Sequence, residues 1–165
     1  VENDNYHIMG GFFCSNLLLN ALSENGAFDI AYKIASQKDY PSWSELIDKC
    51  GDTIGENWHG GASRNHPAFA CISSWYYKAL AGINPDPEHP GYRNILINPQ
   101  PVKEISWVKA AKDTPYGTVS VNWEHDGNDF KIKMEIPAGS TASVTMPDGT
   151  QTELKSGRHE LNCKL

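Results

Sequence analysis

The sequence predicts an α+β protein whose helices and strands lie in separate halves of the chain. Apolar residues recur at helical spacing in the first half, and they alternate with polar residues in the second half. Between the halves lies a proline-rich segment, residues 85–93, which is typical of a linker. We therefore predict a helical domain over residues 1–84 and an antiparallel β-sandwich over residues 94–165.

Four helices are expected in the first half. The first covers residues 11–22, and Asn25-Gly26 ends it because glycine adopts the left-handed backbone conformation without strain. Ser42 suits the cap of the third helix, with Glu45 at the capping-box position, and Pro67 suits the first turn of the fourth. The second, third and fourth helices are predicted over residues 28–35, 43–49 and 67–80.

The second half is predicted to form short strands, because apolar and polar residues alternate there with a period of two. Turn residues separate the strands, as in His-Asp-Gly-Asn at residues 125–128 and Pro-Asp-Gly at residues 147–149. The predicted strands cover residues 94–97, 105–110, 117–124, 129–136, 140–146, 151–154 and 157–161.

The composition is that of an ordinary globular protein, with 39% hydrophobic and 21% charged residues in 165. The net charge of −6, without any run of Lys or Arg, argues against a nucleic-acid partner, since neutralising phosphates requires clustered basic residues. No apolar run approaches the roughly 20 residues of a membrane-spanning helix, so no membrane partner is predicted. The four cysteines form no CxxC motif, and Cys14 and Cys71 are expected to be buried free thiols within helices.

The segment from Gly51 to Trp75 carries the strongest functional signal. Glu56 is an isolated carboxylate in a glycine-rich loop, and Trp58 follows two residues later. Arg64 and His66 bring hydrogen-bonding groups just before the fourth helix. An acid beside an aromatic ring and polar groups suits carbohydrate chemistry, in which the acid transfers a proton and the ring packs on the sugar. The alternative is that Glu56 is a solvated loop acid.

A series of short segments extends through most of the chain in a characteristic order and spacing. They are HIMGGFF at residues 7–13, NALSENG at 20–26, YPSW at 40–43, TIGENW at 53–58, Asn65-His66, WYY at 75–77, LAGI at 80–83 and PGY at 90–92. Together these segments resemble the C-terminal end of the catalytic domain of bacterial α-L-rhamnosidases, glycoside hydrolase family 78.

The resemblance implies an (α/α)6 toroid of twelve helices followed by a β-sandwich. This chain has only about four such helices, so we expect it to be a fragment that lacks the N-terminal half of the toroid. Apolar helix faces would then be exposed and would favour self-association or docking to the missing half. The resemblance further implies a rhamnose-containing glycoside or polysaccharide as substrate, no cofactor, and a periplasmic or extracellular location.

Glu56 falls on the family's general base, which activates water for inverting hydrolysis. An inverting glycosidase needs two carboxyl groups about 6.5–9.5 Å apart, and the family's acid lies upstream of Val1. Asp48 and Asp52 are nearby in the sequence, but neither occupies a position that resembles the acid. We therefore expect the chain alone to be inactive.

Four further residues resemble positions near the family's sugar pocket, and each has a structural alternative. Trp58 could instead pack in the core, as we expect for Trp43. His66 could cap the fourth helix, and His7 could serve only at the entry to the first. Arg64 could orient Glu56 or remain solvated. The sequence also departs from the family, since Gly55 stands where a large aromatic residue precedes the glutamate and Asn57 stands where Arg is common. This departure puts strict L-rhamnose specificity in doubt.

Other classes of protein fit the sequence less well. A zinc site formed by His7, Glu56, His59 and His66 is disfavoured, because the spacing matches no common zinc pattern. A polysaccharide lyase or another toroid glycosidase is a further alternative. A non-catalytic carbohydrate-binding module would expose a row of aromatic residues on one sheet face. The candidates are Trp107, Tyr116 and Trp123, which we expect to pack in the core or at a seam between domains.

Overall fold

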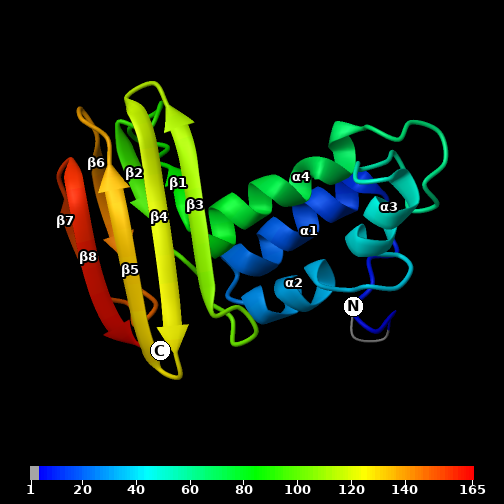
Figure 1. The fold of residues 1–165 in the computed structure, drawn as a ribbon, viewed down its shortest axis with the longest axis horizontal. Coiled ribbons are helices and arrows are strands. Elements are labelled where there is room, and N and C mark those ends of the chain that lie inside the picture. The colour runs from blue at the N-terminus through cyan, green and yellow to red at the C-terminus, as the bar shows by residue number, and fades with distance from the viewer. Residues whose placement is uncertain (1–3) are drawn as a thin grey trace. The chain divides into compact units, whose positions relative to one another are not determined.

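The computed structural model describes residues 4–165, with the backbone alone for Phe12 and Asn16. The chain divides into two compact units, Val1–Trp75 and Tyr76–Leu165, and Figure 1 shows that the first is helical and the second is made of strands. The prediction of segregated helices and strands is confirmed. No helix in the described part of the chain combines the length and the apolar character that a bilayer crossing requires.

The helical unit is organised around its first helix. Helix α1 packs against both α2 and α4, and Figure 1 shows these three elements lying alongside one another. Its core includes Leu19, Ile34, Phe69 and Trp75, each at most 2% exposed. The helices are α1 (Phe12–Glu24), α2 (Phe28–Ala35), α3 (Trp43–Cys50) and α4 (Pro67–Trp75).

The predicted cap at Ser42 and the predicted end of the first helix at Asn25-Gly26 are confirmed. The Ser42 hydroxyl accepts a hydrogen bond from the backbone N–H of Glu45 at 3.1 Å and so caps α3. Gly51 ends the same helix in the left-handed conformation, with φ of 71°. Asn25 is the C-cap of α1, and Gly26 follows with φ of 76°.

The predicted fourth helix is divided into two parts. After α4 the chain forms a π-helical turn, Tyr76–Leu80, in which the N–H of Ala81 donates to the carbonyl of Tyr76 at 3.0 Å. This hydrogen bond spans five residues and gives a wider turn than an α-helix. In this turn Tyr76 is 40% exposed, whereas Ala79 and Leu80 are buried.

The second unit is a sandwich of two four-stranded sheets. One sheet has the order β1-β2-β6-β7 and the other β3-β4-β5-β8. The buried core draws on both sheets, with Ile95, Ile97, Val121, Ile132 and Val144 each at most 1% exposed. The strands are β1 (Ile83–Pro85), β2 (Asn94–Ile97), β3 (Trp107–Thr114), β4 (Gly117–Asp126), β5 (Asp129–Ile136), β6 (Thr141–Thr145), β7 (Gln151–Leu154) and β8 (Gly157–Lys164).

The sheets differ from the prediction in one pairing. All paired strands are antiparallel except β2 and β6, which run parallel, with Ile95 opposite Ala142. Antiparallel neighbours can be joined by a tight hairpin, whereas parallel neighbours need a long crossover. Here the chain between β2 and β6 passes through β3, β4 and β5 of the other sheet, so it returns to β2 in the same direction.

The structure also begins the second unit earlier than the predicted linker. Strand β1 pairs with β2, with Ile83 opposite Ile97 and Pro85 opposite Ile95. It is only three residues long and ends in a proline, as an edge strand can, so it shows no alternating pattern in the sequence. The division into units falls between Trp75 and Tyr76 rather than at residue 84.

The aromatic residues and thiols of the chain follow the predictions only in part. Trp123 is 2% exposed and donates its Nε1–H to the carbonyl of Leu80 at 2.7 Å, which confirms a core position. Trp107 and Tyr116 are 59% and 41% exposed and do not join that core. All four cysteines are free, but Cys14 is exposed and Cys71 only half-buried. The apolar pattern of α1 covers more than one helix face, so it did not identify the buried side.

Candidate active site

The loop between α3 and α4 is closed on itself by backbone hydrogen bonds around Glu56. The N–H of Glu56 donates to the carbonyl of Ser63 at 2.9 Å, and the N–H of Ser63 donates to Glu56 Oε2 at 3.3 Å. The N–H of His66 donates to the carbonyl of Ile54 at 2.8 Å. The two sides of the loop are therefore tied together, and the half-buried carboxylate of Glu56 is held at one oxygen by the backbone.

Trp58 connects this loop to the core of the helical unit. Its ring meets Trp43 edge-on at 5.2 Å between centroids and packs on Phe69 at 4.1 Å. Its Nε1–H donates to the carbonyl of Gly10 at 3.0 Å, and 9% of the residue is exposed. The packing alternative thus accounts for most of the Trp58 surface, and a sugar contact through its remaining edge stays a prediction. Trp43, 3% exposed, is a core residue as predicted.

The predicted polar residues have structural partners of their own. The Nδ1 of His66 accepts a hydrogen bond from the N–H of Ala68 at 3.2 Å, so this side chain caps α4. His7 Nε2 lies 3.3 Å from Asp39 Oδ1. The side chain of Arg64 is exposed, and among the described residues no ion pair joins it to Glu56. Substrate contacts of His66, His7 and Arg64 remain predictions.

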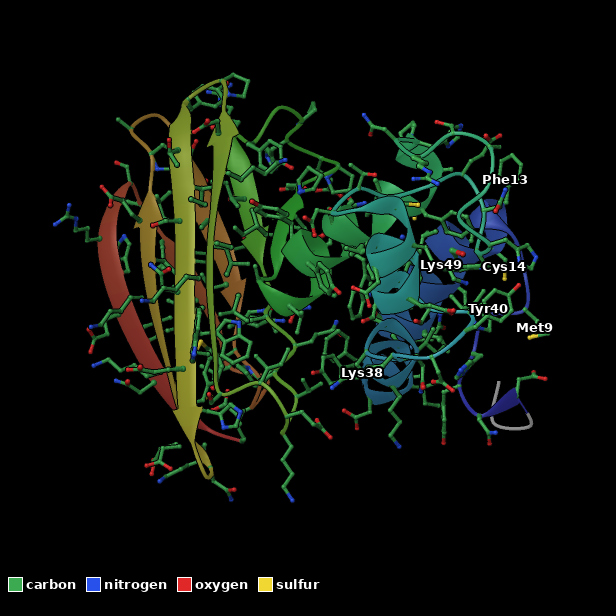
Figure 2. The ribbon with its side chains drawn as sticks, turned by 45° about the vertical axis from the view of Figure 1, so that its right-hand side comes forward. Met9, Phe13, Cys14, Lys38, Tyr40 and Lys49 are labelled. Carbon is green, nitrogen blue, oxygen red and sulfur yellow. The ribbon has the colours of Figure 1, made fainter. Side chains whose placement is uncertain are left out.

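A pair of residues outside the predicted set stands at the edge of this loop. Tyr40 Oη lies 3.2 Å from His59 Nε2, and the two rings stack with centroids 5.2 Å apart. Lys49 Nζ lies 5.0 Å from the centre of the Tyr40 ring, and Figure 2 shows both side chains on the same side of the helical unit. Tyr40 is 44% exposed, and its ring is in contact with both His59 and Lys49. The YPSW segment, which contains Tyr40, is one of the segments that carry the family resemblance. The sequence did not indicate that Tyr40 contacts His59.

Gly55 allows the loop to lie close to α3. A Cβ at this position would lie 2.8 Å from Cys50 Sγ and 3.4 Å from Leu46 Cδ1. The space beside the glutamate is therefore filled by α3 side chains in this protein. This packing gives a physical reason for the departure from the large aromatic residue that the resemblance implies at position 55.

The described residues contain no group of three or more His, Cys, Asp or Glu side chains arranged to hold a metal ion. The structure does not bring His7, Glu56, His59 and His66 together as such a group. The residues around Glu56 instead provide a carboxylate, amide groups and aromatic rings, which can bind a sugar and transfer a proton.

Two family models match the chain in consecutive segments. The bacterial α-L-rhamnosidase 6 hairpin glycosidase domain matches residues 1–80, and the bacterial α-L-rhamnosidase C-terminal domain matches residues 82–160. The chain belongs to the bacterial α-L-rhamnosidase family. The resemblance found in the sequence is thereby confirmed, and the change from one model to the next coincides with the change from helices to strands.

Individual relatives agree with this assignment. The chain is 32% identical over 158 residues to an α-L-rhamnosidase of Streptomyces avermitilis, covering 89% of this chain and 15% of the relative. It is also 32% identical to an α-L-rhamnosidase of Formosa agariphila, covering 93% of this chain and 18% of the relative. The chain therefore spans less than a fifth of the length of these curated relatives.

Solved rhamnosidase structures share the fold. The S. avermitilis α-L-rhamnosidase complexed with L-rhamnose superposes with a TM-score of 0.90 and 29% identity, covering 99% of this chain and 19% of that chain. The enzyme from Dictyoglumus thermophilum gives a TM-score of 0.90 at 25% identity, covering 99% of this chain and 22% of that chain.

Proposed function

We propose that this chain is the C-terminal part of an inverting α-L-rhamnosidase, with Glu56 as the base that activates water. Residues 1–84 would supply the last helices of an (α/α)6 toroid, and residues 94–165 the β-sandwich that follows. The observation that supports this most directly is the position of Glu56, whose carboxylate is oriented by the Ser63 N–H within a family-matched segment. The substrate would be a glycoside or polysaccharide with terminal α-L-rhamnose.

The chemistry requires one more group. An inverting hydrolase places a general acid and a general base on opposite sides of the scissile bond, with about 6.5–9.5 Å between them to admit water. We assign the acid to the part of the enzyme that precedes this chain, so the 165 residues alone would hold only the base. The backbone donor to Oε2 fixes the direction of the carboxylate, and the other oxygen can then accept the proton of the water.

The test is hydrolysis of an aryl α-L-rhamnoside by the full-length protein that contains this chain. Replacing Glu56 with Gln should lower kcat by about 10² to 10⁴-fold, because the amide cannot take the proton. Asp52→Asn, a change of the same chemistry at an exposed position at the start of the loop, should leave the rate unchanged. NMR of the first product should show the β-anomer of the sugar, as inversion requires.

The 165-residue chain by itself should give no turnover in the same assay. Rapid hydrolysis by this chain would contradict the assignment of the acid to a preceding part. A full-length Glu56→Gln variant with an unchanged rate would contradict the role of the base. In that case a carbohydrate-binding or structural role would become the better explanation of the loop.

A further inference from the structure

The outward face of the sheet β3-β4-β5-β8 combines one exposed indole with three lysines. Trp107 of β3 lies opposite Glu124 of β4, which lies opposite Lys131 of β5. Lys109 and Lys133 are two residues further along their strands and so lie on the same face. Trp107 is 59% exposed. An indole with this much exposed surface and surrounding cations is available to a ligand.

This face is recessed. A depression of about 540 Å³ is lined by Trp107, Lys109 and Asn122, among others, and by Lys133. A second depression of about 420 Å³ adjoins it, since Asn122 and Lys133 line both, and it extends to Glu160 on β8. The two depressions therefore lie next to each other on this face, and together they extend across the four strands. Neighbouring strands are about 4.8 Å apart, so the two depressions together are long enough for more than one sugar ring.

The charged side chains around the indole form only weak ion pairs with one another. Lys131 Nζ lies 2.7 Å from Glu160 Oε1, and Lys133 Nζ lies 3.8 Å from Glu160 Oε2. Lys109 Nζ lies over one face of the Trp107 ring, 5.6 Å from its centre, so a pyranose ring would pack on the other face of the indole. The side chains of Lys131 and Glu160 are 38% and 46% exposed, so their ion pair is weak. Lys131 can therefore pair with the carboxylate of a ligand in place of Glu160.

The balance of charge favours an anionic ligand. The linings of the two depressions carry four basic residues against three acidic ones, a local charge of +1 in a chain whose net charge is −6. The basic residues are Lys109, Lys131, Lys133 and Arg158, and the acidic residues are Glu124, Glu135 and Glu160. The electron-rich face of an indole attracts the C–H groups on the apolar face of a pyranose ring. A carboxylate on a neighbouring ring would reach the lysines, while Asn122 can donate to or accept from a hydroxyl.

We propose that this face of the sandwich binds an acidic polysaccharide whose pyranose rings carry carboxylates, with Trp107 as the platform and Lys109 and Lys133 as the carboxylate partners. The proposal concerns the unit Tyr76–Leu165 and does not depend on the role of Glu56. A protein partner fits less well, because the fully buried centre of a protein interface is mainly apolar.

The test is affinity electrophoresis and calorimetry of the 165-residue chain with polygalacturonate, with neutral dextran and dextran sulfate as comparisons. The chain should bind polygalacturonate, and Trp107→Ala should weaken binding by about tenfold or more. Lys133→Gln should also weaken binding and reduce its dependence on salt. Since Trp107 is largely exposed, its replacement should leave the melting temperature unchanged.

Matched controls lie elsewhere on the same unit. Tyr116→Ala removes another exposed aromatic ring, and Lys155→Gln removes another exposed lysine. Both variants should bind polygalacturonate as the parent chain does. Undiminished binding by Trp107→Ala, or an absence of binding by the parent chain, would overturn the proposal. So would equal binding of dextran, or tighter binding of dextran sulfate, since neither polymer carries the carboxylated ring.

Discussion

At the scale of single residues, Asp86 and Glu56 show two uses of a carboxylate held by hydrogen bonds. Asp86 accepts from Asn94 Nδ2 at 2.8 Å and from the N–H of Glu88 at 2.9 Å, and it lies 2.8 Å from His89 Nδ1. Glu56 accepts one backbone hydrogen bond at Oε2. A carboxylate can accept about four hydrogen bonds. Asp86 uses most of these positions for contacts within the protein, whereas Glu56 can still accept a hydrogen bond from a water molecule.

The hydrogen bonds of Asp86 predict a measurable dependence of the protein's stability on pH. Its hydrogen bonds, first that from Asn94 and then that from His89, lower the pKa of Asp86 from 3.8 to about 2. Between these values the unfolded chain binds more protons than the folded chain, so the contribution to stability is full above about pH 4 and is lost as the pH falls towards 2. Asp86→Asn should therefore lower the melting temperature at pH 6 and flatten its decline below pH 4.

Thermal melting followed by circular dichroism at pH 2, 3, 4 and 6 would check this. Glu104→Gln, at an exposed position of the same unit, serves as the control and should melt as the parent chain does. If the Asp86→Asn variant lost stability with acid as steeply as the parent chain, another group would be responsible for the loss.

The sequence predicted single residues well where a local rule applies. Ser42 was identified as a helix cap, because its position before an amphipathic segment is sufficient evidence. Trp58 was expected near the sugar from its proximity to Glu56. It packs on Phe69 and Trp43, and a sugar contact through its remaining edge stays a prediction. The contact between Tyr40 and His59 joins residues nineteen apart and was not predicted, since no local pattern encodes it.

At the scale of elements, the junction between the π-helical turn and the first sheet depends on one glycine. Gly82 has φ of 76°, and its carbonyl accepts the N–H of Asn98 at 2.9 Å. A Cβ at this position would lie 2.3 Å from the nitrogen of Pro99. The close approach allows β1 to pair with β2, with Ile83 opposite Ile97.

We therefore predict that Gly82→Ala destabilises the sandwich strongly. The left-handed conformation alone costs an alanine about 1–2 kcal/mol, and here the clash is with backbone atoms that cannot rotate away. Gly91→Ala is the matched control, because Gly91 has φ of 81° but open space around its Cβ position. Urea unfolding should show a much larger loss for Gly82→Ala than for Gly91→Ala. Equal losses would mean that the conformation and not the close approach governs position 82.

Elements with a strong period were predicted almost to the residue, as for β2, β5 and β7. Strand β1 and the parallel pairing of β2 with β6 were not predicted, because both depend on contacts between residues that are far apart in the sequence. Strand β1 is too short to alternate, and it forms because the edge of β2 is available to it. The parallel pairing of β2 with β6 depends on how the chain crosses between the sheets, which no local period records.

At the scale of the whole molecule, the helical unit exposes apolar side chains that its own core does not use. Met9, Phe13 and Leu17 follow one another at intervals of four residues and are 74%, 75% and 69% exposed. Figure 2 shows Met9 and Phe13 at the same end of the unit as Cys14. We call Met9, Phe13 and Leu17 the apolar strip. Since the chain spans less than a fifth of its curated relatives, we propose that the strip packs against preceding helices in the full-length enzyme.

This proposal predicts opposite effects of one variant in two contexts. In the 165-residue chain, replacing both Phe13 and Leu17 with Ser should reduce self-association in sedimentation velocity, because the exposed apolar area falls. In the full-length protein the same two changes should lower the melting temperature, since they would place hydroxyl groups in a packed interior. Glu24→Ser, at an exposed position near the end of α1, should do neither. A full-length variant that melts as the parent does would mean that the strip stays in solvent, and the helices before it would then have to pack on another face of α1.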